Sequence, residues 1–92
     1  MRHVTYRPAS GVRWVVEDDG ILLDDGAGLV AKVGYPAAAI WDLMARGYRH
    51  GKLVEMVTHI AGLDETAADG LVAEHLERWA ERGVLRKEMA GG

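Results

Sequence analysis

The chain contains no cysteine among its 92 residues. Disulfide bonds, thiol catalysis and cysteine-ligated zinc sites are therefore excluded. Long apolar runs are missing too, since no stretch approaches the roughly 20 residues that a membrane-spanning helix requires. The first residues do not form a signal-peptide pattern, so we expect a cytoplasmic protein without a membrane partner.

Positive charge is scarce for a protein that would bind nucleic acid. The sequence has 11 Lys and Arg against 14 Asp and Glu, which gives a net charge of −3. Affinity for nucleic acid is built mainly from clustered Lys and Arg side chains that neutralise phosphates. This balance predicts that nucleic acid is not a partner.

Motifs for catalysis and for cofactors are also missing. Neither GxGxxG nor GxxxxGK[ST] occurs, so no phosphate-binding loop is predicted. No HExxH or paired i, i+4 ligand spacing is found among the histidines, which are His3, His50, His59 and His75. Each of the acidic pairs Asp18-Asp19 and Asp24-Asp25 precedes a glycine, and turn chemistry explains both. We therefore expect a small non-enzymatic domain with no cofactor and no metal ion.

The stretch DGILLDDGAGLVAKVG, residues 19–34, is the part of the chain around which the rest is organised. It predicts two short strands, Ile21 to Leu23 and Leu29 to Val33, joined by a glycine-containing turn. The preceding run, Val12 to Glu17, can pair as a further strand through a second aspartate-glycine turn. In such a meander the Leu29 strand is an edge with unpaired backbone donors and acceptors, and we expect the function there. Its apolar side chains on both faces indicate that another element covers it.

Three helices are predicted after the sheet, at about residues 36–46, 52–61 and 65–82. Pro36 suits the first position of the first helix, and Asp64 is a candidate N-cap of the third. The fold class is therefore α+β, with a three-stranded antiparallel sheet (strands within about 12–33) followed by three helices, similar to a winged helix-turn-helix. We expect one domain over residues 1–92, with an N-terminal arm and a frayed tail at 86–92.

The third predicted helix has an apolar arc of roughly 180°, wider than the ~100° needed to face one core. At 100° per residue, the arc centres on Ala68, Val72, His75 and Trp79. The helix can therefore bury two surfaces. As a DNA-recognition helix it would present five acidic residues against Arg78 and Arg82, so DNA binding by a winged helix is a minor alternative. A dimerisation module that pairs through the bare edge is another.

The order of these parts resembles the PqqD-like domains, which are recognition elements of ribosomally made peptide natural products. The resemblance lies in GILLDD-GAG-LVAKV, in PAAAIWDLM and in KLVEMVTHIAGLDETAADGLVAEHLERWAERGVL, and it covers Val12 to Leu85. The chain looks most similar to the free-standing leader-binding subunit of split lasso-peptide processing systems. It departs from many relatives at Val33-Gly34-Tyr35-Pro36-Ala37, where they have Leu-Asn and then Thr-Gly.

The resemblance implies that the leader segment of a precursor peptide adds as a strand to the third-strand edge and lies against the third helix. The implied ladder residues are Leu29, Val30, Ala31, Lys32 and Val33, and the implied helix residues are Asp69, Val72, Ala73 and Leu76. Asp69 would pair with a basic leader residue, whereas Lys32 would either meet an acidic one or protect the edge from aggregation. The opposite flank of the helix would instead present Leu71, His75 and Arg78.

The resemblance also implies what this protein would work with. It would hold the leader and deliver the precursor to a separate transglutaminase-like cysteine peptidase, with a cyclase acting afterwards. A PqqD-like chaperone of another peptide natural product or of a quinone-cofactor pathway is the related alternative.

Overall fold

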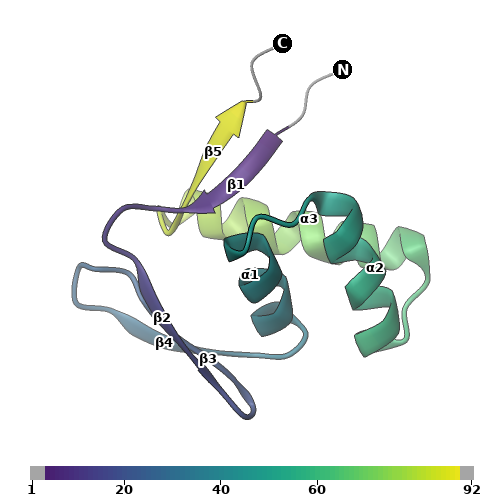
Figure 1. Cartoon of the computed structure of the whole chain (residues 1–92), viewed down its shortest axis with the longest axis horizontal. Helices are drawn as coiled ribbons and strands as arrows, with labels where there is room; N and C mark the ends of the chain where they lie inside the picture. The colour runs from purple at the N-terminus through teal and green to yellow at the C-terminus, as the bar shows by residue number, and fades with distance from the viewer. Residues whose placement is uncertain (1–3, 90–92) are drawn as a thin grey trace.

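Two aspartate-glycine turns fold residues 13–34 into a three-stranded antiparallel meander (Figure 1). In the computed structural model, which describes residues 4–89, the meander consists of β2 (Arg13–Glu17), β3 (Gly20–Asp24) and β4 (Val30–Gly34), with β3 in the centre. Three helices follow it, so the predicted α+β class with a three-stranded sheet before three helices is confirmed. The helices are α1 (Ala37–Ala45), α2 (His50–Ala61) and α3 (Glu65–Glu81).

The register of the sheet follows the alternation of its apolar residues. Ile21 lies opposite Val16 and Val33, while Leu23 lies opposite Trp14 and Ala31. These residues share the inner face, which packs toward α1, and Ile21 and Leu23 are buried. The outer face carries the other residues of each strand, because successive side chains point to opposite faces.

The predicted third strand begins one residue too early. Leu29 belongs to the turn, because its N–H donates to the Asp25 carboxylate and its carbonyl accepts from the Asp25 N–H. Asp24 and Asp25 also accept from the N–H groups of Gly26 and Ala27, which confirms that turn chemistry explains this acidic pair.

The helices begin and end where local chemistry stabilises their termini. Asp64 is the N-cap of α3, as predicted, and its carboxylate accepts from the Ala67 N–H at 2.8 Å. Gly62 ends α2 in the left-handed region at φ 65°, which glycine adopts without a steric penalty. Pro36 is the N-cap of α1 and not its first helical residue, and α2 begins at His50, two residues before the predicted start.

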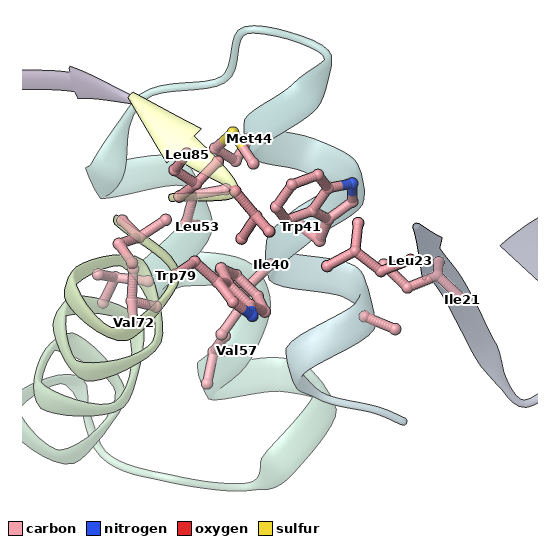
Figure 2. Packing of buried hydrophobic residues seen from close by; sticks show 14 of the residues in the cluster. Ile21, Leu23, Ile40, Trp41, Met44, Leu53, Val57, Val72, Trp79 and Leu85 are labelled. Atoms are coloured by element: carbon pink, nitrogen blue, oxygen red, sulfur yellow. The ribbon is translucent and has the colours of Figure 1, made fainter. Parts of the chain in front are cut away.

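Trp41 of α1 is the centre of the hydrophobic core (Figure 2). Its ring is fully buried and makes edge-to-face contacts with Trp14 of β2 and Trp79 of α3, at centroid distances of 5.6 and 5.3 Å. Such aromatic pairs contribute about 0.5–1.5 kcal/mol each beyond the area that they bury. The three tryptophans thus connect the sheet to α3 through α1.

The arm and the tail predicted from the sequence are wrong over most of their length. β1 (Val4–Pro8) and β5 (Leu85–Met89) pair with each other as an antiparallel ribbon. Leu85, at the start of β5, is buried in the core, and Arg7 bonds Glu88 across the two strands at 3.0 Å. The remainder of the predicted arm and tail, residues 1–3 and 90–92, lies outside the described residues.

None of the three helices within residues 4–89 combines the length and the apolar composition that crossing a membrane requires.

Candidate functional site

The backbone of β4 is one of the two edges of the three-stranded sheet, and β2 is the other. The two-residue turn Asp18-Asp19 makes Glu17 and Gly20 the hydrogen-bonded pair that closes the first hairpin. Hydrogen-bonded and non-hydrogen-bonded pairs then alternate along an antiparallel ladder. Gly20, Leu22 and Asp24 consequently direct their main-chain groups toward β2, and the residues between them direct theirs toward β4.

The same alternation fixes which groups of β4 are free. Ala31 and Val33 lie opposite Leu23 and Ile21, so their N–H and C=O groups bond to β3. The N–H and C=O groups of Val30, Lys32 and Gly34 therefore point away from the sheet. We call these main-chain groups the β4 edge. The predicted ladder of Leu29 to Val33 is thus shifted, because Leu29 lies in the turn and Gly34 takes part in the edge.

Close backbone contact holds β4 against β3 at the Gly34 end. An added Cβ at Gly20 would lie 2.1 Å from the carbonyl oxygen of Val33. Only glycine permits this approach. The position of the β4 edge therefore depends on a residue of the neighbouring strand.

The side chains of β4 differ between the two faces of the sheet. Val33 on the inner face is half-buried against the core, and Ala31 beside it is exposed. On the outer face Val30 is 57% exposed. Lys32 lies between Val30 and Gly34 on this face, and its ammonium contacts Asp19 at 2.7 Å and Glu17 at 2.9 Å.

Lys32 is consequently not a free cation. Its hydrogen bonds with Asp19 and then Glu17 raise the pKa of the ammonium, and the hydrogen bond from Lys32 lowers the pKa of Asp19. Lys32 and Asp19 therefore stay charged at neutral pH. The expected meeting of Lys32 with an acidic leader residue has to compete with these two carboxylates.

The predicted helix residues fall into two groups. Val72 and Leu76 are 0% and 2% exposed, so they pack inside the core and offer no free surface to a ligand. Asp69 and Ala73 are exposed. Asp69 does not stand alone, however, because its carboxylate contacts the His50 ring nitrogen of α2 at 2.5 Å.

One flank of α3, Asp69, Ala73 and Glu77, faces neighbouring elements. The Glu77 carboxylate accepts from the Tyr6 hydroxyl of β1 at 2.6 Å and contacts Lys87 Nζ of β5 at 2.9 Å. The two contacts lower the pKa of Glu77, and burial together with Glu77 raises the pKa of Tyr6 to about 12. We call it the covered flank because the start of α2 and the β1–β5 ribbon contact it through Asp69 and Glu77, although its three residues stay exposed.

The opposite flank of α3 consists of Leu71, His75 and Arg78, which we call the open flank. Leu71 and His75 are half-buried, and the His75 ring lies against Trp79 at a centroid distance of 5.5 Å. Burial and then the charge of Arg78 lower the pKa of His75, so the ring is neutral at pH 7. Predicting His75 near the centre of the buried stripe was wrong, since the helix is rotated so that Leu76 takes that place.

Figure 1 shows α1 between the three-stranded sheet and α3, and the β1–β5 ribbon beside the C-terminal end of α3. The open flank lies on the other side of α3 from Glu77, which contacts the ribbon. α1 contacts both the sheet and α3. The strand with the β4 edge and the helix with the open flank are thus connected through α1.

A surface hollow of about 440 Å³ lies elsewhere, between α2 and the start of α3, where Gly51, Val54, Glu55, Thr58 and Glu65 line it. It contains none of the predicted site residues. Within residues 4–89, no three His, Asp or Glu side chains gather closely enough to hold a metal ion.

Two features of the site were not identified from the sequence. Gly34 was outside the predicted strand, although the two-residue turn Asp18-Asp19 sets the alternation that makes it part of the β4 edge. The sequence does not decide between the two flanks of α3, because the choice depends on the β1–β5 ribbon, whose pairing joins residues some 80 positions apart.

Comparison with known proteins gives a structural likeness. No protein-family model matches the chain, and no curated protein sequence matches it. A solved structure of lasso peptide synthetase B1 complexed with the leader peptide is similar, with a TM-score of 0.79 and 21% sequence identity. The match covers 88% of this chain and 96% of that chain. The likeness shows that the two chains share a fold.

Proposed function

We propose that this protein binds the leader segment of a ribosomally made precursor peptide by adding it as a strand to the β4 edge. In this binding mode main-chain hydrogen bonds supply affinity, and contacts with alternate side chains supply specificity. The protein would act in lasso-peptide biosynthesis as a PqqD-like, free-standing recognition subunit.

The observation that carries the proposal is the open main-chain edge of β4. Three residues, Val30, Lys32 and Gly34, direct main-chain donors and acceptors away from the sheet. An exposed edge of this kind is a template for pairing with another strand. The shared fold with a synthetase subunit that was solved with its leader peptide supports the same use of the fold here.

The alternation of a bound strand defines its contacts. Residues of the peptide opposite Ala31 and Val33 would point to the inner face, toward Leu71 and His75 of the open flank. A neutral, half-buried imidazole and a leucine side chain suit apolar residues at these positions. Residues opposite Val30, Lys32 and Gly34 would point to the outer face.

The protein itself would catalyse no reaction. Its role would be to raise the effective concentration of the precursor at a separate transglutaminase-like cysteine peptidase, after which a cyclase closes the ring. We expect the complex to form in the cytoplasm, where the precursor is synthesised.

Calorimetric titration with the synthetic leader peptides encoded beside the gene tests the proposal. We expect binding at about micromolar affinity or tighter, with a negative heat-capacity change from the apolar surface that is buried. Sedimentation of the same sample separates this function from self-association through the β4 edge. A folded monomer that binds none of these peptides would contradict the proposal.

A further inference from the structure

The three-stranded sheet carries all of the net charge of the protein. Residues 13–34 contain five acidic side chains and two basic ones, a net charge of −3, which equals the net charge of the whole chain. The remaining residues contain nine charges of each sign. The negative charge is therefore concentrated on the element that presents the β4 edge.

The acidic residues lie at both ends of β4. Gly20 pairs with Gly34, so the Asp18-Asp19 turn lies at one end of the strand. Asp24 pairs with Val30, so the second acidic turn lies at the other end. Lys32 in the middle compensates for only one of the two carboxylates that it contacts.

The acidic turns are close enough to act on a strand bound to β4. Neighbouring strands are about 4.8 Å apart, so an added strand would lie roughly 10 Å from β3. This distance is similar to the Debye length of about 8 Å at physiological salt, and the extended side chains of Lys and Arg shorten it further. Outward residues of the peptide would share the outer face with Lys32 and Asp24, because paired residues point to the same face.

We infer that the peptide taken by the β4 edge is basic on its outer face, an inference that rests on the proposed function. It would carry Lys or Arg at the positions opposite Val30 and Gly34, which are four residues apart. Apolar residues would occupy the positions opposite Ala31 and Val33 and face the open flank of α3.

The test is a calorimetric titration with the leader peptide encoded beside the gene, using the wild type, Asp19→Asn/Asp24→Asn and a control. Asparagine keeps an oxygen that can accept from Lys32 and from the turn N–H of Gly26, so both hairpins are retained. The control, Glu55→Gln/Glu65→Gln, removes the same number of charges at the hollow between α2 and α3. Circular dichroism checks that all three proteins are folded.

We expect the Asp19→Asn/Asp24→Asn protein to bind about tenfold more weakly than the wild type at low salt, because two charge contacts at the edge of the interface are lost. The control should bind as the wild type does. Wild-type affinity should also fall between about 50 mM and about 500 mM NaCl, a measurement that needs no variant.

The outcomes separate this inference from the proposed function. Leader binding that is unchanged by both the aspartate substitutions and the salt would overturn the basic-peptide inference and leave the proposed function standing. Tighter binding by the aspartate variant would also overturn it. A wild-type protein that binds no encoded leader would overturn both.

Discussion

The Lys32 ammonium on β4 bonds Glu17 on β2, across the width of the sheet, and also contacts Asp19 at 2.7 Å. Because β3 lies between these two strands, the lysine side chain reaches back over the outer face and not beyond the β4 edge. A lysine on an edge strand usually discourages pairing with another strand. Here the ammonium is paired with two carboxylates over the outer face, so it does not block the main-chain groups of β4.

Proline at position 32 tests whether main-chain groups of the β4 edge bind the peptide. The Lys32 N–H points away from the sheet, so Lys32→Pro removes a donor to the ligand and no hydrogen bond to β3. We expect leader affinity to fall by at least about tenfold relative to Lys32→Ala, which loses the same side chain and keeps the N–H. Calorimetric titration measures the difference.

Proline at the neighbouring residue, Ala31, should instead destabilise the fold. The Ala31 N–H bonds to β3, so Ala31→Pro removes a ladder hydrogen bond and should lower the free energy of unfolding by about 1–3 kcal/mol, as thermal melting would show. If Lys32→Pro binds the leader as tightly as Lys32→Ala does, strand addition at the β4 edge is wrong.

Substitutions on the two flanks of α3 should have different effects on peptide binding. Leu71→Gln replaces an apolar contact of the open flank with a polar group and should weaken leader binding about tenfold. Ala73→Gln makes a similar polar surface on the covered flank and should leave affinity unchanged. A larger loss with Ala73→Gln, measured by the same titration, would place the peptide on the covered flank instead.

Local patterns predicted the elements that depend on local chemistry. Asp64 followed by Glu65 and an apolar periodicity predicted the start of α3, and the two aspartate-glycine turns predicted the meander. The edge position of β4 followed from the order of the strands. In each case neighbouring residues determine the structure, so the sequence was sufficient.

The parts that the sequence did not predict depend on distant residues. β1 and β5 lie at opposite ends of the sequence. Arg7 with Glu88 joins the two strands, and Tyr6 with Glu77 joins β1 to α3, contacts that a local pattern does not specify. The predicted rotation of α3 about its axis was wrong for a related reason. A wide apolar arc fits several orientations, and packing against the neighbouring elements decides that Leu76 is fully buried and His75 only half-buried.

The contact between Tyr6 and Glu77 should stabilise the packing of the β1–β5 ribbon against α3. Tyr6→Phe removes the hydroxyl that donates to the carboxylate and should lower the free energy of unfolding by about 1 kcal/mol, or about 4–8 °C in Tm. Because the folded pKa of about 12 is above the unfolded value of 10.0, this stability is complete below pH 10 and is lost as the pH rises toward 12.

Melting curves of the wild type and Tyr6→Phe as a function of pH measure this effect. The difference in Tm should be constant near neutral pH and should shrink above pH 10. A difference that stays constant through that range would show that the hydroxyl does not keep its proton through the contact with Glu77.

Replacing either of two glycines with alanine should change the free energy of unfolding, in opposite directions. Gly70 is exposed within α3, and nothing lies within 4 Å of an added Cβ, so Gly70→Ala should raise the free energy of unfolding by about 0.5–1 kcal/mol. Gly20→Ala would force Val33 away and should lower it by about 1–3 kcal/mol. Urea unfolding distinguishes the two, and a stabilised Gly20→Ala protein would contradict the packing of β3 against β4.

The neutral His75 ring should make stability depend on pH near 6. Its pKa in the folded protein is lowered from 6.5 by burial and by Arg78, while Glu74 opposes the shift. The unfolded chain therefore binds a proton at a higher pH than the folded protein does. The stability that comes from the neutral ring is complete above pH 6.5 and is lost as the pH falls through the folded pKa.

His75→Gln removes this titration and keeps a polar side chain of moderate size. We expect the Tm of the wild type to fall more steeply than that of His75→Gln between pH 6.5 and about pH 5. The carboxylates also titrate toward the lower end of this range, so the quantity to compare is the difference in Tm between the two proteins at each pH. Parallel curves would mean that the His75 ring takes up a proton as easily in the folded protein as in the unfolded chain, and that the open flank is more hydrated than its burial indicates.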